Sequence, residues 1–368
     1  MRGGLRPAPC RLSGATEARG RPSPGFRPPR AATNLLGCRI DLGGTSVQPA
    51  GPASGVRPAM NHPPRPHHTP RATPPRPPTV KARLAQAIGR NWARVGYARH
   101  VEPTWLELNR FTLPVRGLAA AFDGLKVAHL TDFHYGPHLP KGYVEGALER
   151  AQAEKPDVIA LTGDFIDRGP KHLHAAAKLF RHLKAPLGVF GVLGNHDFSV
   201  HTGRGVRRHA DLHRHVADAL GNEGVRVLRN ESVRLERPGG GLVVAGVDDL
   251  WSLESNPAAA LAGSCPDTPR LVLAHNPRSV EQFAGHRFDL MLSGHTHGGQ
   301  VDWPGLGRLM LSRKAKRWAA GMYAHDGGQV YVNKGVGYGW RFRFGVRPEV
   351  AVFTLRSVGN DQGPMTHQ

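Results

Sequence analysis

Two histidines, His295 and His297, stand two residues apart in the segment 293–300, directly after the apolar run 290–292. At the end of a buried strand, and in a turn flanked by glycines, imidazoles with this spacing can aim ring nitrogens into one cavity. Imidazole binds most divalent transition metals, so a shared metal is the chemistry that this pair could perform. Alone the pair is a weak signal, because a His-x-His on a surface loop is more often incidental.

Polar groups of the same kinds follow four other apolar runs. They are Asp132 with His134; Asp164 with Asp167; Asn195, His196 and Asp197; and His275. Taken singly, each is more often a turn or a satisfied polar residue, since Asp and Asn hydrogen-bond their own backbone. Five such groups at five predicted strand ends indicate a metal site, because ligands gather at the carboxyl ends of parallel strands.

The elements that must position these groups alternate along the chain. Apolar runs at 125–130, 158–161 and 189–193 predict buried strands, and helical spacing over 141–154 and 172–183 predicts the helices between them. This βαβαβ order favours a largely parallel sheet with helices outside it. Further strands are predicted at 225–228, 233–235, 242–247, 271–274, 290–292, 330–332 and 350–355, with helices near 209–220 and 278–283. That many strands favours two packed sheets.

The charge of the chain is concentrated at its start. Of the net charge of +21, residues 1–100 contribute +15, from 17 Lys or Arg against Glu17 and Asp41, which leaves +6 for the other 268 residues. The global charge is therefore no evidence for nucleic-acid binding by the folded part. Three cysteines are too few for a disulfide framework, and no apolar run reaches the length of a membrane span. We expect a cytoplasmic protein that could lie peripherally on the inner membrane surface.

Composition divides the chain into four parts. Residues 1–78 are rich in Pro and Arg and are expected to be disordered, or to precede a true start at Met60. Residues 79–100 predict a basic amphipathic helix, which either packs on the domain or lies on an anionic membrane surface. Residues 101–358 form the predicted catalytic domain, and 359–368 a disordered tail.

The motifs together resemble the calcineurin-like metallophosphoesterase superfamily over residues 125–355. The residues of segments 274–277, 294–300 and 332–335 are similar to the corresponding motifs of its bacterial phosphodiesterase branch, of the YaeI/YkuE type. The resemblance implies a four-layer αββα sandwich of two mixed β-sheets flanked by helices. Family members commonly begin with a membrane anchor or a twin-arginine signal, and this sequence shows neither.

The resemblance also implies a dinuclear metal centre. Asp132, His134 and His297 would bind one metal, Asn195, His275 and His295 the second, and Asp164 would bridge both. The mixed oxygen and nitrogen ligands, with no thiolate, favour Mn, Fe or Zn, without selecting among them. A hydroxide held between the two metals would attack phosphorus.

Two further residues have implied catalytic roles. His196 would donate a proton or hydrogen bond at the leaving-group side, with Asp197 holding its ring. Asp167 would either support a ligand or cap a helix.

The resemblance implies hydrolysis of a phosphodiester or pyrophosphate bond. Some relatives act on UDP-2,3-diacylglucosamine, so a lipid-linked substrate is one candidate. A nuclease or cyclic-nucleotide phosphodiesterase is the alternative, although we do not expect nucleic acid as a partner. A metal-free scaffold is the third candidate, and seven intact ligand positions argue against it.

Five further residues could contact a substrate. Three arginines could reach its phosphate or be solvated, namely Arg168, Arg341 and Arg343. Two tryptophans, Trp303 and Trp340, could stack on a base or line a lipid cleft. The sequence leaves the oligomeric state open.

Overall fold

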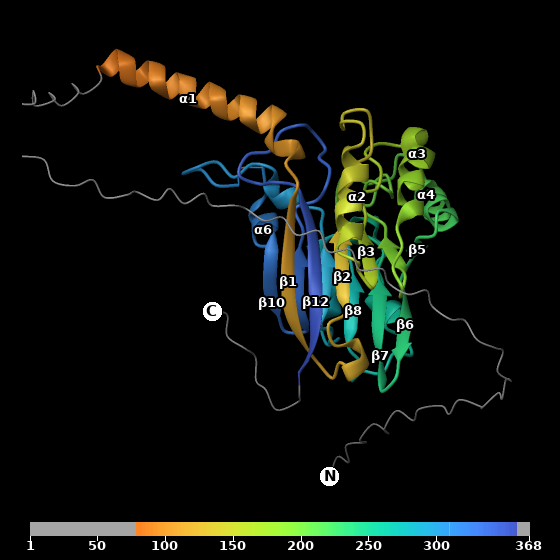
Figure 1. Cartoon of the computed structure of the whole chain (residues 1–368). Coiled ribbons are helices and arrows are strands. Elements are labelled where there is room, and N and C mark those ends of the chain that lie inside the picture. The colour runs from red at the N-terminus through yellow and green to blue at the C-terminus, as the bar shows by residue number, and fades with distance from the viewer. Residues whose placement is uncertain (1–78, 309, 359–368) are drawn as a thin grey trace, which may run out of the picture. The chain divides into compact units, whose positions relative to one another are not determined.

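Two six-stranded sheets form the centre of a computed structural model that describes residues 79–308 and 310–358 (Figure 1). The first sheet has the order β1 (Glu107–Arg116), β12 (Glu349–Val358), β2 (Lys126–Leu130), β3 (Val158–Thr162), β4 (Val189–Val192) and β5 (Arg226–Val227). The second has the order β10 (Gly321–His325), β11 (Gly328–Val332), β9 (Leu290–Ser293), β8 (Arg270–Leu273), β7 (Gly240–Gly246) and β6 (Glu231–Arg237).

Both sheets are mixed. In the first, β2, β3, β4 and β5 run parallel, β12 pairs antiparallel with β2, and β1 pairs parallel with β12. In the second, β7, β8, β9 and β11 run parallel, and β6 and β10 pair antiparallel at the two edges. The predicted parallel core is therefore present in each sheet, and the mixed sheets implied by the family resemblance are confirmed.

Three hydrophobic clusters separate four layers. One hydrophobic cluster joins the first sheet to α2 (Tyr143–Ala153), α3 (Leu173–Lys178) and α4 (Leu212–Asn222). The second lies between the sheets, where Val127 and Ala160 of one sheet and Leu271 of the other are fully buried. The third joins the second sheet to the 3-10 helix η6 (Pro277–Phe283) and to Trp318. Burial on both faces explains why the central strands are continuous apolar runs.

Some elements differ from those expected. β1 and β10 were not predicted, because most of their residues are only partly buried or are exposed, and neither strand is a continuous apolar run. The predicted helix at 172–183 is three short pieces, namely η3 (Pro170–His172), α3 and η4 (Leu179–His182), and 278–283 is 3-10 rather than α. The short helices α5 (Pro257–Ala260) and α6 (Arg313–Lys316) were also missed, as were η1 (Glu102–Thr104), η2 (Ala120–Phe122), η5 (Leu250–Ser252) and η7 (His297–Gly299).

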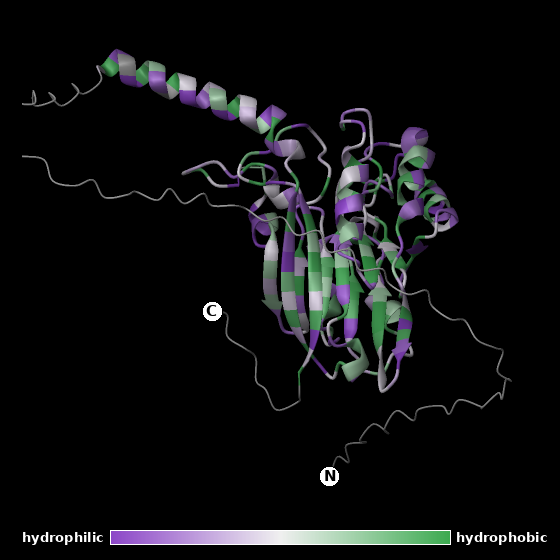
Figure 2. Cartoon of the chain, in the orientation of Figure 1, coloured by the Kyte–Doolittle hydropathy of each residue, from purple (hydrophilic) through white to green (hydrophobic). Residues whose placement is uncertain are grey.

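Helix α1 (Val80–His100) precedes the first sheet and alternates apolar and polar residues along its length (Figure 2). Its last turn packs on the domain, since Ala98 is fully buried and Tyr97 meets Trp105 and Phe344 edge-on. Its earlier apolar residues are exposed. Within the described residues no helix is long and apolar enough to cross a membrane. The predicted disordered segments, 1–78 and 359–368, lie outside the described residues.

Candidate metal centre

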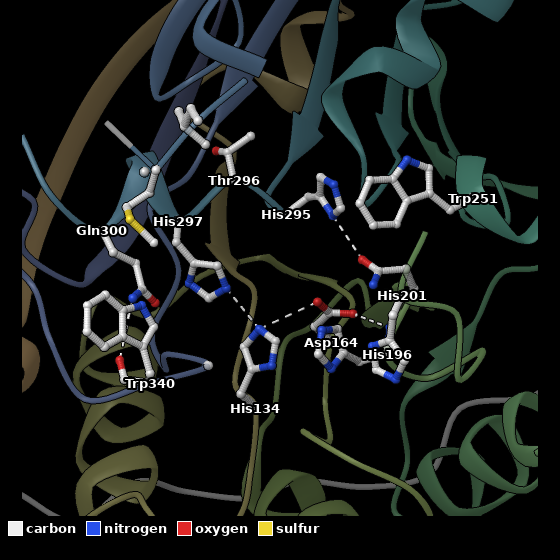
Figure 3. A pocket seen from close by; sticks show the side chains of 15 residues that line it. His134, Asp164, His196, His201, Trp251, His295, Thr296, His297, Gln300 and Trp340 are labelled. Carbon is white, nitrogen blue, oxygen red and sulfur yellow. Dashed lines mark hydrogen bonds and ion pairs between the residues drawn. The ribbon is translucent and has the colours of Figure 1, made fainter. Parts of the chain in front are cut away.

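The candidate site lies where parallel strands of both sheets end. Asp132 and His134 follow β2, Asp164 follows β3, Asn195 follows β4, His275 follows β8, and His295 and His297 follow β9. The sheets are tied together here, because His275 Nδ1 lies 2.7 Å from the carbonyl oxygen of Thr162. All seven predicted ligand residues are therefore brought to one edge of the sandwich, and several of them line a single pocket (Figure 3).

The backbone at this edge is held in an uncommon conformation. Among the described residues, ten residues other than glycine have a positive φ, and five of them are Asp132, His134, Asp164, His295 and His297. Left-handed conformation is costly for such residues and persists only where the surrounding fold over-determines it, typically at functional sites. The strand ends therefore hold these side chains by rigid local geometry.

Two glycines allow the strand ends to approach one another. A Cβ at Gly194 would lie 2.2 Å from Asp164 Oδ1, and one at Gly294 would lie 2.1 Å from Asp132 Oδ2. Any side chain at either position would displace a carboxylate of the site. The Gly-Asn and Gly-His pairs of the motifs thus have a steric cause.

Asp132, His134 and His297 form what we call the first cluster. The Nε2 atoms of His134 and His297 face each other at 2.8 Å. Asp132 Oδ1 lies 3.4 Å from His297 Nε2 and 3.9 Å from His134 Nε2. Two ring nitrogens and a carboxylate oxygen therefore converge on one point.

Asn195, His275 and His295 form the second cluster. Asn195 Oδ1 lies 2.9 Å from His295 Nδ1 and 3.2 Å from His275 Nε2, and the two ring nitrogens are 3.3 Å apart. Asp164 stands between the clusters, with Oδ2 3.5 Å from His134 Nε2 and 3.3 Å from His275 Nε2. One carboxylate oxygen is thus shared by a nitrogen from each cluster.

Burial and mutual charge set the protonation of these groups. Burial opposes charge on Asp164, but the neighbouring His275 and His196 overcome it and hold its pKa well below the usual range. Burial also opposes charge on His275, whose pKa is nevertheless raised well above normal by Asp164. Burial, reinforced by the charge on His275, lowers the pKa of His295 to about 3. Neutral His295 presents a lone pair, which is the form that binds metal.

His196 lies against the shared carboxylate. Its backbone N–H donates to Asp164 Oδ1 at 2.9 Å, and its Nδ1 lies 2.5 Å from the carbonyl oxygen of Asp167, to which it donates. The ring lines the pocket, edge-on to His134. Because Nδ1 is used, Nε2 is the atom left for a substrate.

Asp197 does not hold the ring of His196, so the expected contact is wrong. Asp197 is fully buried, and it accepts backbone N–H groups of Phe165, Ile166 and Gly194 at 2.9 to 3.4 Å. Burial and the nearby Asp164 raise the pKa of Asp197 to about 7. Its carboxylate points toward the turns after β3 and β4, because the backbone N–H groups of these turns need an acceptor. It fixes the loop after β4 rather than the ring.

Asp167 supports the site. Its carbonyl holds His196, and its Oδ1 lies 3.6 Å from His134 Nδ1. It does not cap a helix, since η3 begins after Gly169 without a side-chain cap. Of the two interpretations that the sequence left open, the geometry supports the first.

The predicted phosphate-binding arginines behave differently from one another. Arg343 is fully buried and donates to the carbonyls of Lys334 and Gly337, with Nη2 3.4 Å from His297 Nδ1. Neither interpretation of Arg343, phosphate contact or solvated surface, is correct. The Arg168 side chain is 77% exposed beside Asp167. Partly buried Arg341 has no hydrogen-bond partner for Nε.

Several pocket residues were missed by sequence reasoning. His201, Trp251, Met310 and Leu311 line the pocket together with the predicted Trp340, whereas Trp303 packs on Phe344 instead. Trp251 meets His295 edge-on at 4.5 Å, and its backbone N–H donates to Asp249. The pair Asp248-Asp249 after β7 is a sixth polar strand end, and it could have pointed to Trp251.

The donors suit divalent first-row cations. They are imidazole nitrogens, carboxylate oxygens and one amide oxygen, drawn together by the main chain at distances that a cation would bridge. Such a set fits Mn, Fe or Zn and is unlike a calcium site or a thiolate site.

Comparison with known proteins agrees with this geometry. Residues 125–299 match the family model described as calcineurin-like phosphoesterase. The chain is 34% identical to phosphodiesterase YaeI of Escherichia coli, over 71% of this chain and 92% of that protein. It is 31% identical to the uncharacterized metallophosphoesterase YkuE of Bacillus subtilis, over 72% and 90%. It is 26% identical to UDP-2,3-diacylglucosamine pyrophosphatase LpxG of Chlamydia muridarum, over 70% and 91%. The chain belongs to the calcineurin-like phosphoesterase family.

Proposed function

We propose that this chain is a dinuclear metal-dependent hydrolase that cleaves the pyrophosphate bond of a lipid-linked substrate. One observation carries the dinuclear centre: Asp164 Oδ2 lies within 3.5 Å of a ring nitrogen from each cluster. A carboxylate in that position can hold two cations at the separation used in two-metal hydrolysis, roughly 3.5 to 4 Å.

The first cluster would hold one cation and the second cluster the other, with Asp164 common to both. When bound, the two cations would supply Lewis acidity toward the phosphoryl oxygens and would lower the pKa of a water molecule. The protein contributes fixed ligand orientation. For example, both oxygens of Asp132 accept the backbone N–H of His295 at 3.0 Å, so this carboxylate cannot rotate freely.

His196 would act on the leaving group. Its Nδ1 proton is committed to the Asp167 carbonyl, so Nε2 is the atom that can exchange a proton with substrate. Burial lowers the pKa of His196, which keeps the ring neutral before substrate arrives. A phosphate anion in the pocket favours the protonated ring, which then donates from Nε2 to the departing oxygen.

The pocket wall supports an amphipathic substrate. Trp251, Met310, Leu311 and Trp340 lie around the same pocket as the polar clusters. Aromatic and aliphatic side chains beside phosphate-binding chemistry suit a molecule with apolar and anionic parts. The relative named UDP-2,3-diacylglucosamine pyrophosphatase acts on a molecule of that kind.

A substrate screen tests the proposal. The full chain is stripped with chelator and reloaded with Mn, Fe or Zn, and then offered a phosphomonoester, a phosphodiester, a cyclic nucleotide and UDP-2,3-diacylglucosamine. We expect metal-dependent cleavage of the last, with UMP and the acylated sugar phosphate as products. Turnover of cyclic nucleotides alone would favour the cyclic-nucleotide phosphodiesterase, and no metal-dependent turnover would contradict the proposal.

A further inference from the structure

Helix α1 leaves a line of apolar side chains in solvent. Val80, Leu84, Ile88 and Trp92 are 82%, 62%, 50% and 72% exposed. They recur every four residues, so they share one face of the helix, and we call them the α1 stripe. Contiguous exposed apolar residues on a soluble domain mark an interaction surface.

The charge on α1 has a single sign. Its 21 residues contain five Lys or Arg and no Asp or Glu. At 3.6 residues per turn, Arg83, Arg90 and Arg94 project roughly 100 to 140° from the centre of the α1 stripe. An apolar face on a helix whose other charged residues are all cations suits an anionic bilayer, where the apolar side chains enter the headgroup boundary and the long basic side chains reach the lipid phosphates.

A second segment of the same make-up lies beside α1. Leu306 and Met310 are 61% and 59% exposed. The guanidinium of Arg94 lies 5.9 Å from the ring centre of Trp303, three residues before Leu306. Four exposed basic residues follow in and next to α6, namely Arg313, Lys314, Lys316 and Arg317. Two separate basic and apolar segments match an extended surface such as a bilayer better than a groove for one helix.

The last turn of α1 is tied to the pocket wall. The backbone N–H of Arg343 donates to the carbonyl of Ala98 at 2.9 Å, and that of Phe344 donates to the carbonyl of Gln300 at 2.9 Å. Gln300 and Met310 both line the pocket. A surface that receives the α1 stripe and Met310 would therefore lie next to the pocket.

We propose that α1 docks this protein on an anionic lipid bilayer. The α1 stripe enters the headgroup boundary, and the basic residues of α1 and α6 contact lipid phosphates. Docking stands on the exposure and charge of these segments and is independent of the proposed reaction, although it would bring the pocket to a lipid-linked substrate.

Vesicle sedimentation of the full chain tests the proposal. The vesicles contain either phosphatidylcholine alone or equal parts of phosphatidylcholine and phosphatidylglycerol. With the anionic vesicles we expect the double variant Leu84→Ser with Trp92→Ser to bind more weakly than the unaltered chain, by a factor on the order of ten or greater. Arg83→Gln with Arg90→Gln should weaken binding about fivefold for each charge removed.

Matched variants separate α1 from the rest of the chain. Val206 is 69% exposed outside α1 and α6, so Val206→Ser should bind as the unaltered chain does. The double variant Lys171→Gln with Lys178→Gln removes one exposed charge from η3 and one from α3, and it should also leave binding unchanged. Residues 1–78 are present in every variant, so their charge is constant across the comparison.

Two further readouts identify the mode of binding. Brominated lipid should quench part of the tryptophan fluorescence of the unaltered chain, and this part should disappear in Trp92→Phe while sedimentation persists. Turnover of a small phosphodiester should be equal in all variants. The proposal is overturned if the α1 variants bind as tightly as the unaltered chain, or if neutral vesicles bind equally well. Loss with the arginine variant but not with the Leu84 and Trp92 variant overturns it too, and indicates a polyanion such as nucleic acid.

Discussion

The two clusters of the candidate site offer the same number of ligands but differ in charge. The first cluster has its own carboxylate, Asp132, whereas the second has the neutral amide of Asn195 in the equivalent place. Both share Asp164. Affinity for a divalent cation rises with ligand charge, so we expect the second cluster to hold its metal more weakly. The buried cation of Arg343, 3.4 Å from His297 Nδ1, acts against this difference, because it repels a cation in the first cluster.

The largest effect should come from the residue that both clusters share. Asp164→Asn keeps the side-chain shape but removes the charge, so we expect both metals and all turnover to be lost. Elemental analysis after gel filtration measures the metal, and thermal unfolding verifies the fold. Asp211→Asn, at an exposed carboxylate, is the control. Retention of one metal would mean that Asp164 belongs to a single cluster.

The next effect separates catalysis from metal binding. His196→Gln should lower turnover of a phosphodiester by roughly 10²-fold or more, the usual cost of losing a general acid, with both metals retained. His201→Gln is the matched control, because that ring lines the same pocket and packs edge-on to His196. Since His134, Asp164 and His196 could together hold an ion, loss of metal in His196→Gln would assign this histidine to the ligands.

A histidine outside both clusters provides a reference for pH dependence. His129 is fully buried between the sheets, with Nε2 2.8 Å from Thr162 Oγ1, and burial lowers its pKa to about 3. The unfolded chain binds a proton below about pH 6.5, whereas the folded chain does not until about pH 3, so stability falls as the pH is lowered. For this group the loss of unfolding free energy between pH 7 and pH 5 should be about 2 kcal/mol.

Urea unfolding in chelator measures this loss. His129→Gln keeps a hydrogen-bonding partner for Thr162 and should remove that part of the pH dependence. An identical pH dependence in His129→Gln and the unaltered chain would assign the acid sensitivity to other groups, including the clusters themselves.

The smallest effect should come from equalising the clusters. Asn195→Asp gives the second cluster its own carboxylate, so we expect its metal affinity to rise by about tenfold or more. Asp132→Asn is the mirror variant, and it should weaken the first cluster. Competition with a chelator at graded concentrations measures both. If the more weakly held metal is unaffected by Asn195→Asp, the charge difference does not set the order of affinity.

The strand ends were predictable because burial and metal binding each require particular residue types within a short segment of the sequence. Buried parallel strands must be apolar throughout, and the turn after each must be tight, so runs such as 158–161, with Gly163 two residues later, are visible in the sequence. The predicted ligands could therefore be placed at one edge without any knowledge of packing.

The failures have different causes. Asp197 and Arg343 are hydrogen-bonded to main-chain groups of other segments, and nothing in the local sequence identifies those partners. Edge strands such as β1 are half exposed and carry no apolar run. Trp251 lies in the short helix η5, which Asp249 caps at the backbone N–H of Trp251. Asp197 and β1 depend on partners that are distant in the chain, whereas the partners of Arg343 and Trp251 are nearby in the sequence and depend on how irregular loops fold.

The position of β12 has a consequence for biosynthesis. β12 lies between β1 and β2, and its ten residues pair in register with β1, from Glu107 with Glu349 to Arg116 with Val358. During translation β1 therefore leaves the ribosome long before its partner β12 has been synthesised. The edge of β2 that pairs with β12 is also unpaired until then. Pairings between such distant segments are slow and leave strand edges open in the meantime. The first sheet can be completed only after the last described residues have been synthesised, and until then β1 and β2 are exposed to chaperones and to mispairing.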